Sequence, residues 1–206
     1  AYIQIIGNNF FVRQGEVRFA RTLTLPANRG RILDRNGLIL ASSVPVQAIW
    51  AFPEEVNQQA DRAKLAKMAK LLGMPLKSIE AKLANDEKNF VYIKRQVDED
   101  VAKQIADLGI AGIYQRKEYR RQYPEGAAVA HIVGFTDIED KGLEGVERTF
   151  NEQLAGKAGS RRVIRDRLGR VVESVGDGIP PLDGKDLHLT IDSKVQYFAW
   201  QKLRDA

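Results

Sequence analysis

Apolar side chains recur along the chain at two spacings, one typical of strands and one typical of helices. β-branched and aromatic residues dominate residues 44–52, which predicts a strand that lies at a sheet edge near Pro45. Alternating side chains along residues 90–97 predict a second strand. Helical spacing predicts a helical hairpin over residues 58–85, whose first helix ends at Gly73.

The rest of the chain continues this mixture of short elements. The other predicted elements are a helix over residues 8–19, an extended segment at 22–25, a helix capped by Asp98 and ending at Gly109, a basic strand over 112–123, an amphipathic helix over 143–154, a hairpin over 160–175, a strand over 187–191 and a helix capped by Asp192. Strands and helices do not alternate regularly. The predicted fold class is therefore α+β, an elongated arrangement of hairpins and short helices with a small helical-hairpin subdomain inserted.

Residues 29–41 combine a turn signal with a dense set of charges. Asn36 and Gly37 stand between two apolar runs, and an Asn-Gly pair tolerates the positive φ angles of a two-residue hairpin turn. Asp34 lies among arginines at positions 29, 31 and 35, whose guanidinium groups are potential donors of charge-assisted hydrogen bonds to its carboxylate. The alternative is a solvated turn with ordinary surface charges.

Composition narrows the possible chemistry. The 206 residues are 44% hydrophobic, which suffices for a sizeable core, and they include no Cys, which excludes disulfides, a thiol nucleophile and a Cys-ligated zinc site. The net charge of +5 suits nucleic acid or an anionic membrane surface. The sequence starts with an apolar stretch and stops within a helical pattern, so we expect a fragment of a longer protein.

Five motifs occur in a fixed order: RGRILDRNGLILA at 29–41, RRQYPEGAAVAHIVGF at 120–135, GLEGVERTFNEQLAGKAG at 142–159, DRLGRVVE at 166–173 and LHLTIDSKVQ at 187–196. Together they resemble the amino-terminal half of class B penicillin-binding proteins, which are bacterial enzymes that cross-link peptidoglycan. Residues 43–56 look most like the division-specific septal transpeptidase of Gram-negative bacteria. The elongation enzyme of the same class is the alternative.

The resemblance implies a domain plan and a location. Residues 1–175 would form a non-catalytic periplasmic pedestal with residues 58–110 as an inserted head-like subdomain, residues 176–184 a linker, and residues 185–206 the start of the transpeptidase domain. The parent protein would be anchored in the bacterial inner membrane by one helix. Its implied partners are a SEDS-type glycosyltransferase and bitopic division proteins, and the wall-peptide substrate would bind only the missing domain.

The serine-enzyme motifs of the class are absent from this chain. Penicilloyl-serine transferases need Ser-x-x-Lys, Ser-x-Asn and Lys-Thr/Ser-Gly, whereas Ser78 is followed by Lys82 four residues later. A chain without an activated serine and its oxyanion donors cannot acylate. We therefore expect no catalytic residue, no metal and no cofactor here, while the full-length parent would be a serine-type D-Ala-D-Ala transpeptidase.

The resemblance assigns structural or interaction roles to the residues that match its motifs. They are Arg29, Gly30, Asp34, Arg35, Gly37, Arg121, Tyr123, Pro124, Gly126, His131, Gly134, Gly142, Glu144, Gly145, Glu147, Asp166, Arg167, Gly169 and Arg170. A purely folding role and a partner contact both remain open for the first motif. His131 falls in an apolar run, which favours a hydrogen-bonded core histidine, and His188 is interpreted in the same way.

Alternative functions follow from the charged residues. Glu144 and Glu147, three positions apart on a helix, suggest an acid/base role in an autonomous cell-wall hydrolase. Such an enzyme needs carboxylates on both sides of the substrate, whereas one helical face provides only one side. Residues 116–121 form a basic segment that suits anionic lipid or acidic wall material, or simply a solvated strand face. Scattered aromatics do not form a stacking platform for nucleic acid. We also expect Asp34 and Arg167 to lie near each other, joining the two hairpins.

Overall fold

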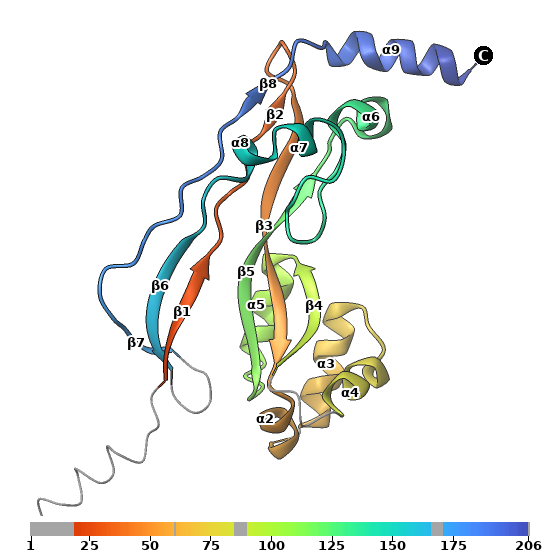
Figure 1. Cartoon of the computed structure of the whole chain (residues 1–206). Coiled ribbons are helices and arrows are strands. Elements are labelled where there is room, and N and C mark those ends of the chain that lie inside the picture. Colours follow the sequence, from red (N-terminus) through yellow and green to blue (C-terminus); the bar gives the residue numbers. More distant parts are fainter. Residues whose placement is uncertain (1–18, 60, 85–89, 166–170, 206) are drawn as a thin grey trace, which may run out of the picture. The chain divides into compact units, whose positions relative to one another are not determined.

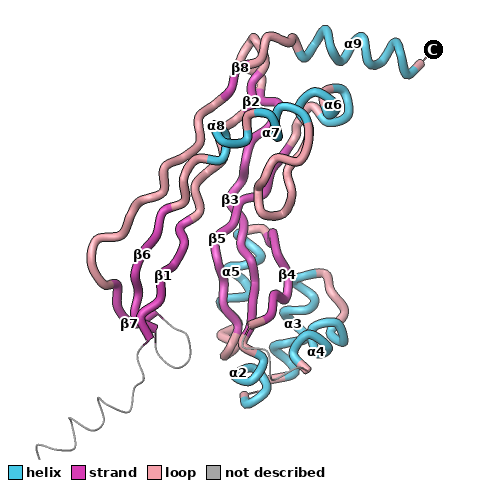
Figure 2. The backbone as a smooth tube through the Cα atoms, viewed as in Figure 1, coloured by secondary structure: helices cyan, strands magenta, loops and turns pink. Residues whose placement is uncertain are grey.

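The structure is a computed structural model that describes residues 19–59, 61–84, 90–165 and 171–205 (Figure 1). The chain divides into two compact units, a smaller one of residues 1–25 and 158–181 and a larger one of residues 26–157 and 182–206. Helices and strands are mixed in open sheets, which confirms the predicted α+β class (Figure 2).

The smaller unit contains a three-stranded antiparallel sheet of order β1-β6-β7. Its strands are β1 (Phe19–Leu25), β6 (Gly159–Arg165) and β7 (Val171–Ser174). They confirm the extended segment predicted at residues 22–25 and the hairpin predicted over residues 160–175. The turn residues Asp166, Arg167, Gly169 and Arg170 lie outside the described residues, as does the helix predicted over residues 8–19 except for Phe19. The proximity of Asp34 and Arg167 therefore stays a prediction.

The larger unit is built around one long strand. Its strands are β2 (Ile32–Leu33), β3 (Ile39–Ala51), β4 (Val91–Val97), β5 (Ile113–Gln122) and β8 (Leu187–His188). Strand β3 pairs with β5 along Ser42–Ala51, and on its other side it pairs with β2 at one end and with β4 at the other. Pro45 lies in the gap between these two pairings, where no ladder needs its missing N–H, so the predicted local edge is confirmed.

One end of β3 supports a helical subdomain. Its helices are α2 (Pro53–Gln58), α3 (Arg62–Leu72), α4 (Leu76–Leu83) and α5 (Glu99–Asp107). Fully buried Ile49, Met68, Ile79 and Ile93 form the centre of its core. The predicted helical hairpin is confirmed as α3 and α4, and Gly73 ends α3 in the left-handed region at φ 61°.

Asp98 does not cap α5 with its side chain, contrary to the sequence prediction. It occupies the N-cap position but makes no capping hydrogen bond. Its carboxylate instead accepts a bond of 2.7 Å from Arg120 Nη2 of β5. An ion pair to the neighbouring strand has replaced the local cap.

The other end of β3 packs into a second core. The helices there are η1 (Gly126–Ala128), α6 (Ala130–Val133), α7 (Gly145–Thr149), α8 (Asn151–Ala155) and α9 (Ser193–Arg204). Buried Ile32, Leu40, Val133 and Leu154 meet in this core. Among the described residues, no helix is both long and apolar enough to cross a membrane.

The single helix predicted over residues 143–154 is wrong. The chain leaves the helical conformation at Phe150, with φ −108° and ψ 24°, so α7 and α8 are separate short helices. The break turns Asn151 toward Gly142, whose N–H donates to Asn151 Oδ1 at 2.9 Å. An asparagine that bonds other backbone groups competes with helix continuation.

The buried Met68 gives a direct test of the helical core. We expect Met68→Ala to lower the free energy of unfolding by about 2 to 5 kcal/mol, because it leaves a cavity in a fully buried site. Urea denaturation followed by circular dichroism measures this loss. Lys67→Ala, at the adjacent exposed position, should change the free energy by less than about 0.5 kcal/mol. Equal effects of both substitutions would contradict this packing.

Candidate functional site

The hairpin of residues 29–41 is confirmed, but its turn differs from the prediction. The N–H of Gly37 donates to Asp34 O at 3.1 Å, so Arg35 and Asn36 occupy the centre of the turn. Gly37 follows it at φ 82°, while Asn36 does not have a positive φ. This is a three-residue loop with a left-handed glycine, not a two-residue Asn-Gly turn.

Asp34 binds backbone groups and not guanidinium groups, contrary to the sequence prediction. Its Oδ1 accepts from the N–H groups of Asn36 and Leu38, both at 2.8 Å, and its Oδ2 accepts from Ser193 N at 3.1 Å. Burial raises the pKa of Asp34, but these backbone donors outweigh it and hold the pKa below its usual value. The carboxylate therefore fixes the turn and reaches the first residue of α9.

Further bonds from the hairpin tip, residues 34–36, hold the segment that leads into α9. Arg35 N donates to Ile191 O at 3.0 Å, and Arg35 Nε donates to Thr190 O at 2.8 Å. Asn36 Nδ2 donates to Asp192 Oδ2 at 3.0 Å, while Asp192 Oδ1 caps α9 as predicted. Strand β8 lies parallel to β2 directly before this segment.

Arg29 lies at the centre of a polar cluster made of Arg29, Arg121, Tyr123, Glu147 and Asn151 and called the arginine cluster. Arg29 and Glu147 are fully buried, and the other three residues are partly buried. Arg29 Nε pairs with Glu147 Oε2 at 2.8 Å, and its Nη2 donates to Glu147 O at 2.9 Å. Its Nη1 donates to Asn151 Oδ1 at 2.9 Å and to Asp140 O at 3.0 Å. All its nitrogens therefore have partners, as a buried guanidinium requires.

Arg121 approaches Glu147 from the other side. Its Nε pairs with Glu147 Oε1 at 2.7 Å, and its Nη2 donates to Gly30 O at 2.8 Å. Tyr123 donates through its hydroxyl to the same Glu147 oxygen at 3.4 Å and accepts from Thr136 N at 3.1 Å. Burial and the charge of Glu147 raise the pKa of Tyr123.

Two motif glycines are required by close backbone approaches at this cluster. A Cβ on Gly30 would lie 2.1 Å from Lys185 O, and a Cβ on Gly142 would lie 2.0 Å from Glu147 O. Neither contact is sterically possible. Glycine at these positions lets β2 approach the segment before β8, and lets the loop before α7 approach that helix.

Asp140 is a further acid beside the cluster. Its backbone takes the left-handed conformation at φ 62°, and its Oδ1 is buried without a hydrogen-bond partner among the described residues. Burial raises the pKa of Asp140 to about 6, against the lowering effect of Arg29 and Arg121. Sequence reasoning missed this residue.

The other predicted site residues differ in whether they pack near the cluster or are exposed to solvent. Gly134 and Gly145 lie against each other's backbone segments near the cluster, whereas Pro124, Gly126 and Glu144 are exposed. His131 is exposed on α6, so the predicted core histidine is wrong: this short helix buries Val133 and turns His131 to solvent. His188 is exposed as well.

Asn151 and Asp186 are site residues that sequence reasoning missed. Asn151 joins Arg29 to Gly142, and an asparagine inside a predicted helix was a usable signal because it competes with helix hydrogen bonds. Asp186 accepts from Arg31 N at 2.7 Å and pairs with Arg31 Nη2 at 2.6 Å. No local pattern marked that partner, which lies 155 positions away.

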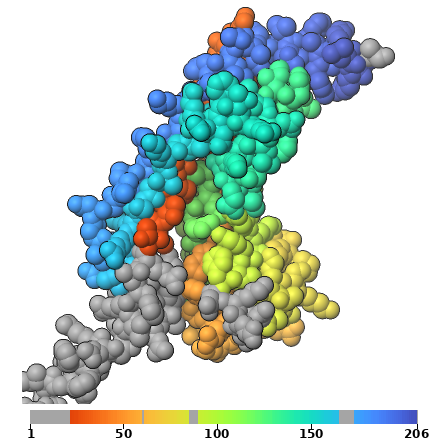
Figure 3. Space-filling view, in the orientation of Figure 1, coloured from red at the N-terminus to blue at the C-terminus, as the bar shows by residue number. Residues whose placement is uncertain are grey.

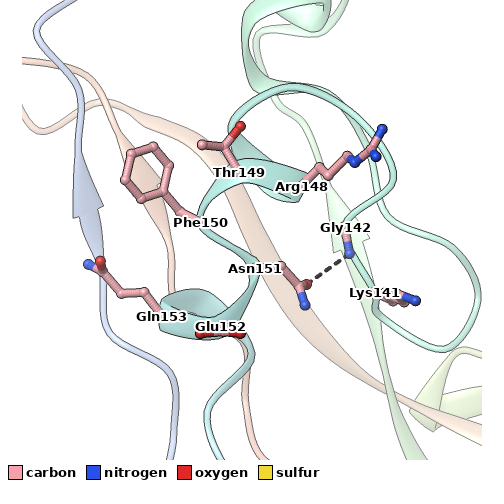
Figure 4. Close-up of a pocket in the computed structure, with 8 residues that line it drawn as sticks. All are labelled: Lys141, Gly142, Arg148, Thr149, Phe150, Asn151, Glu152 and Gln153. Carbon is pink, nitrogen blue, oxygen red and sulfur yellow. Dashed lines mark hydrogen bonds between the residues drawn. The ribbon is translucent and has the colours of Figure 1, made fainter.

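The cluster can hold the fold but offers no reactive group. Both oxygens of Glu147 face guanidinium groups and its side chain is fully buried, so it cannot meet a substrate as an acid or base. Among the described residues, no group of three or more His, Cys, Asp or Glu side chains could hold a metal ion. A cavity of about 520 Å³ is lined by Asn151 together with the cations Lys141 and Arg148 (Figure 4).

Comparisons with known proteins agree with one another. The sequence profile described as Penicillin-binding Protein dimerisation domain matches residues 24–189. The chain is 39% identical over 207 residues to a protein of Neisseria meningitidis named a probable peptidoglycan D,D-transpeptidase, PenA, and 39% identical over 212 residues to the peptidoglycan D,D-transpeptidase FtsI of Escherichia coli. Each alignment covers 100% of this chain and 36% of the relative, so the chain spans little more than a third of these proteins.

A solved structure shares the fold. It is a complex between Penicillin-Binding Protein (PBP2) and MreC from Helicobacter pylori, which is similar over 91% of this chain and 39% of the solved chain. The TM-score is 0.66 and the sequence identity is 20%, a likeness that concerns the fold alone.

We expect Glu147→Gln to lower the free energy of unfolding of the larger unit by about 3 to 5 kcal/mol. The substitution leaves Arg29 and Arg121 buried without a neutralising charge. Urea denaturation measures the loss, and Glu144→Gln, at an exposed position of the same motif, serves as the control. A loss below about 1 kcal/mol for Glu147→Gln would show that the pair does not stabilise the fold.

The raised pKa of Asp140 predicts that its contribution to the free energy of unfolding depends on pH. Because its folded pKa of about 6 lies above the ordinary aspartate value of 3.8, its protonation stabilises the fold at low pH, and this stability is lost as the pH rises through 6. Asp140→Asn cannot ionise. We expect the variant to gain roughly 1 to 2 kcal/mol over the wild type between pH 5 and pH 7.5, measured by urea denaturation at both values. An equal difference at the two values would rule out the raised pKa.

Proposed function

Because the chain belongs to the penicillin-binding protein dimerisation domain family, we propose that it is the non-catalytic pedestal of a longer peptidoglycan D,D-transpeptidase. Such an enzyme cross-links the peptides of the bacterial cell wall. One observation carries the proposal: the hairpin tip fixes residues 190–193, from which α9 projects.

Helix α9 is firmly held at its first turn and exposed along most of its length (Figure 3). Its apolar side chains Val195, Phe198 and Leu203 are 66%, 61% and 80% exposed. Apolar side chains gathered on one helix are usually covered by another surface. We assign that surface to a catalytic domain that starts within residues 185–206, after a linker at residues 176–184.

In this assignment residues 1–175 form the pedestal, and the helical subdomain within residues 58–110 is its head. The arginine cluster fixes one end of the sheet, because it joins the segment before β2, the end of β5 and α7. A rigid support of this kind would set the distance and orientation of a catalytic domain relative to the membrane. The bond-forming serine then belongs to the part of the parent protein that follows this chain.

The finer assignment is a division-specific enzyme that works at the septum, anchored in the inner membrane with this chain on the periplasmic side. Its partners would be a SEDS-type glycosyltransferase and bitopic division proteins. The Helicobacter pylori structure supports protein partners in general, since its title names a complex with MreC. The elongation-type enzyme of the same class is the second candidate, behind the division-specific enzyme that residues 43–56 resemble most.

Asp34→Asn tests whether the hairpin tip holds α9. We expect amide hydrogen exchange at residues 190–196 to become about tenfold faster, because the carboxylate oxygens that accept from Ser193 and from the turn are altered, while α3 keeps its protection. Asp177→Asn, at an exposed position, is the control. In the full-length parent, Asp34→Asn should lower cross-linking while penicillin acylation persists.

Two results would contradict the proposal. Unchanged exchange at residues 190–196 in Asp34→Asn would remove the support for the anchoring role. A stoichiometric fluorescent-penicillin adduct on the 206-residue chain would contradict the non-catalytic assignment.

A further inference from the structure

Strand β5 is an edge strand along its whole length. Ile113–Gln122 pair with Ala51–Ser42 of β3, and among the described residues of the larger unit no strand pairs with the other side of β5 (Figure 2). An edge strand presents backbone N–H and C=O groups that a second extended chain can bind. The ten residues of β5 therefore form an edge to which a second strand can be added.

The other edges of the same sheet are less suited to strand addition. On β4, the carbonyls of Tyr92 and Ile93 already accept from Lys82 Nζ, at 3.2 and 2.6 Å. β8 is only two residues long. In the described part of the larger unit, β5 is thus the long edge that remains open.

The charges on this edge are mostly positive. Arg116 is 53% exposed and Arg120 is 34% exposed, and Lys117 is exposed too. Arg116 and Arg120 lie on one face of the sheet, because side chains four positions apart on a strand point the same way. A basic edge repels basic strands and favours acidic ones.

The acid within β5 does not cancel this charge. Glu118 is 8% exposed, and its Oε1 accepts from Arg95 Nε at 2.9 Å and from Arg95 Nη2 at 2.6 Å. Arg116 Nη2 reaches the same oxygen only at 3.3 Å. One carboxylate thus serves two arginines, and Arg116 retains capacity for a second acid. Arg120 Nη2 already pairs with the exposed Asp98 Oδ1 at 2.7 Å, so an added acid there would share this guanidinium group with Asp98.

A small cavity lies at the Arg120 end of the strand. It has a volume of about 210 Å³, and Tyr123 and the half-exposed Ile138 are among its lining residues. Gln96 of β4 also lines this cavity, so the cavity lies over the face of the sheet that carries Arg120.

We propose that the free edge of β5 binds an extended segment of a partner protein by strand addition, and that this segment carries acidic residues at alternate positions. Two of its carboxylates, four residues apart, would meet Arg116 and Arg120 across the new ladder. Backbone hydrogen bonds would supply affinity, and the charges would set register and partner choice. The inference deepens the partner-binding part of the proposed function, but it does not depend on the anchoring of α9.

Synthetic peptides test the proposal on the 206-residue chain. The probe is a fluorescein-labelled peptide of four Thr-Glu repeats, compared with a peptide of four Thr-Lys repeats by fluorescence anisotropy. We expect the Thr-Glu peptide to bind at least tenfold more tightly and to slow amide exchange within residues 113–122. Two further Thr-Glu peptides carry N-methyl groups on all Thr or on all Glu amides. We expect one of these two patterns to abolish binding, because it blocks the donors that face β5.

Charge reversal supplies the matched control. We expect Arg116→Glu/Arg120→Glu to prefer the Thr-Lys peptide, whereas Lys67→Glu/Lys70→Glu, the same change on exposed positions of α3, keeps the wild-type preference. Equal binding of both N-methylated peptides would show simple charge attraction and overturn strand addition. Absence of binding to the wild-type chain, or an unchanged preference in the correctly folded Arg116→Glu/Arg120→Glu variant, would also overturn it. Since none of these assays involves residues 190–196, failure here is distinguishable from failure of the anchoring role.

Discussion

The fold depends on one buried carboxylate held between two guanidinium groups. Glu147 pairs with Arg29 and Arg121, residues 118 and 26 positions away, and all three side chains are withdrawn from water. Burying such charges is costly unless each finds its partners, so the segments that supply them must meet in one geometry. The glycines at 30 and 142 and the break at Phe150 follow from this requirement, because each lets a segment come close enough.

The cluster also explains how two cores remain parts of one unit. One core lies under the helical subdomain and the other under α6 to α8, and β3 contributes to both, with Ile49 in the first and Leu40 in the second. The cluster fixes the ends of β2 and β5 at the second core. The hairpin tip then extends this fixed geometry to α9. The short segment from Arg29 to Asp34 therefore connects the cluster to the hairpin tip.

The sequence predicted those parts of the fold that depend on local pattern. Periodicity and capping located α3, α4, β4 and β5, and the motif resemblance to penicillin-binding proteins is confirmed by the family match and the relatives. The partners of Asp34 could not be predicted, because one of them, Ser193, lies 159 positions away. The exposure of His131 depends on how a four-residue helix faces the core, which composition does not reveal. Glu147 was placed among motif residues, but its two arginines were not identified as its partners.

The parallel pairing of β2 with β8 has a consequence for biosynthesis. The hairpin leaves the ribosome early. Ser193, whose N–H donates a hydrogen bond to Asp34, is synthesised 159 residues later. At typical elongation rates this interval lasts about 8 to 30 seconds. During that time the side of β2 that pairs with β8 has no partner strand, so this part of the sheet is completed only late in synthesis.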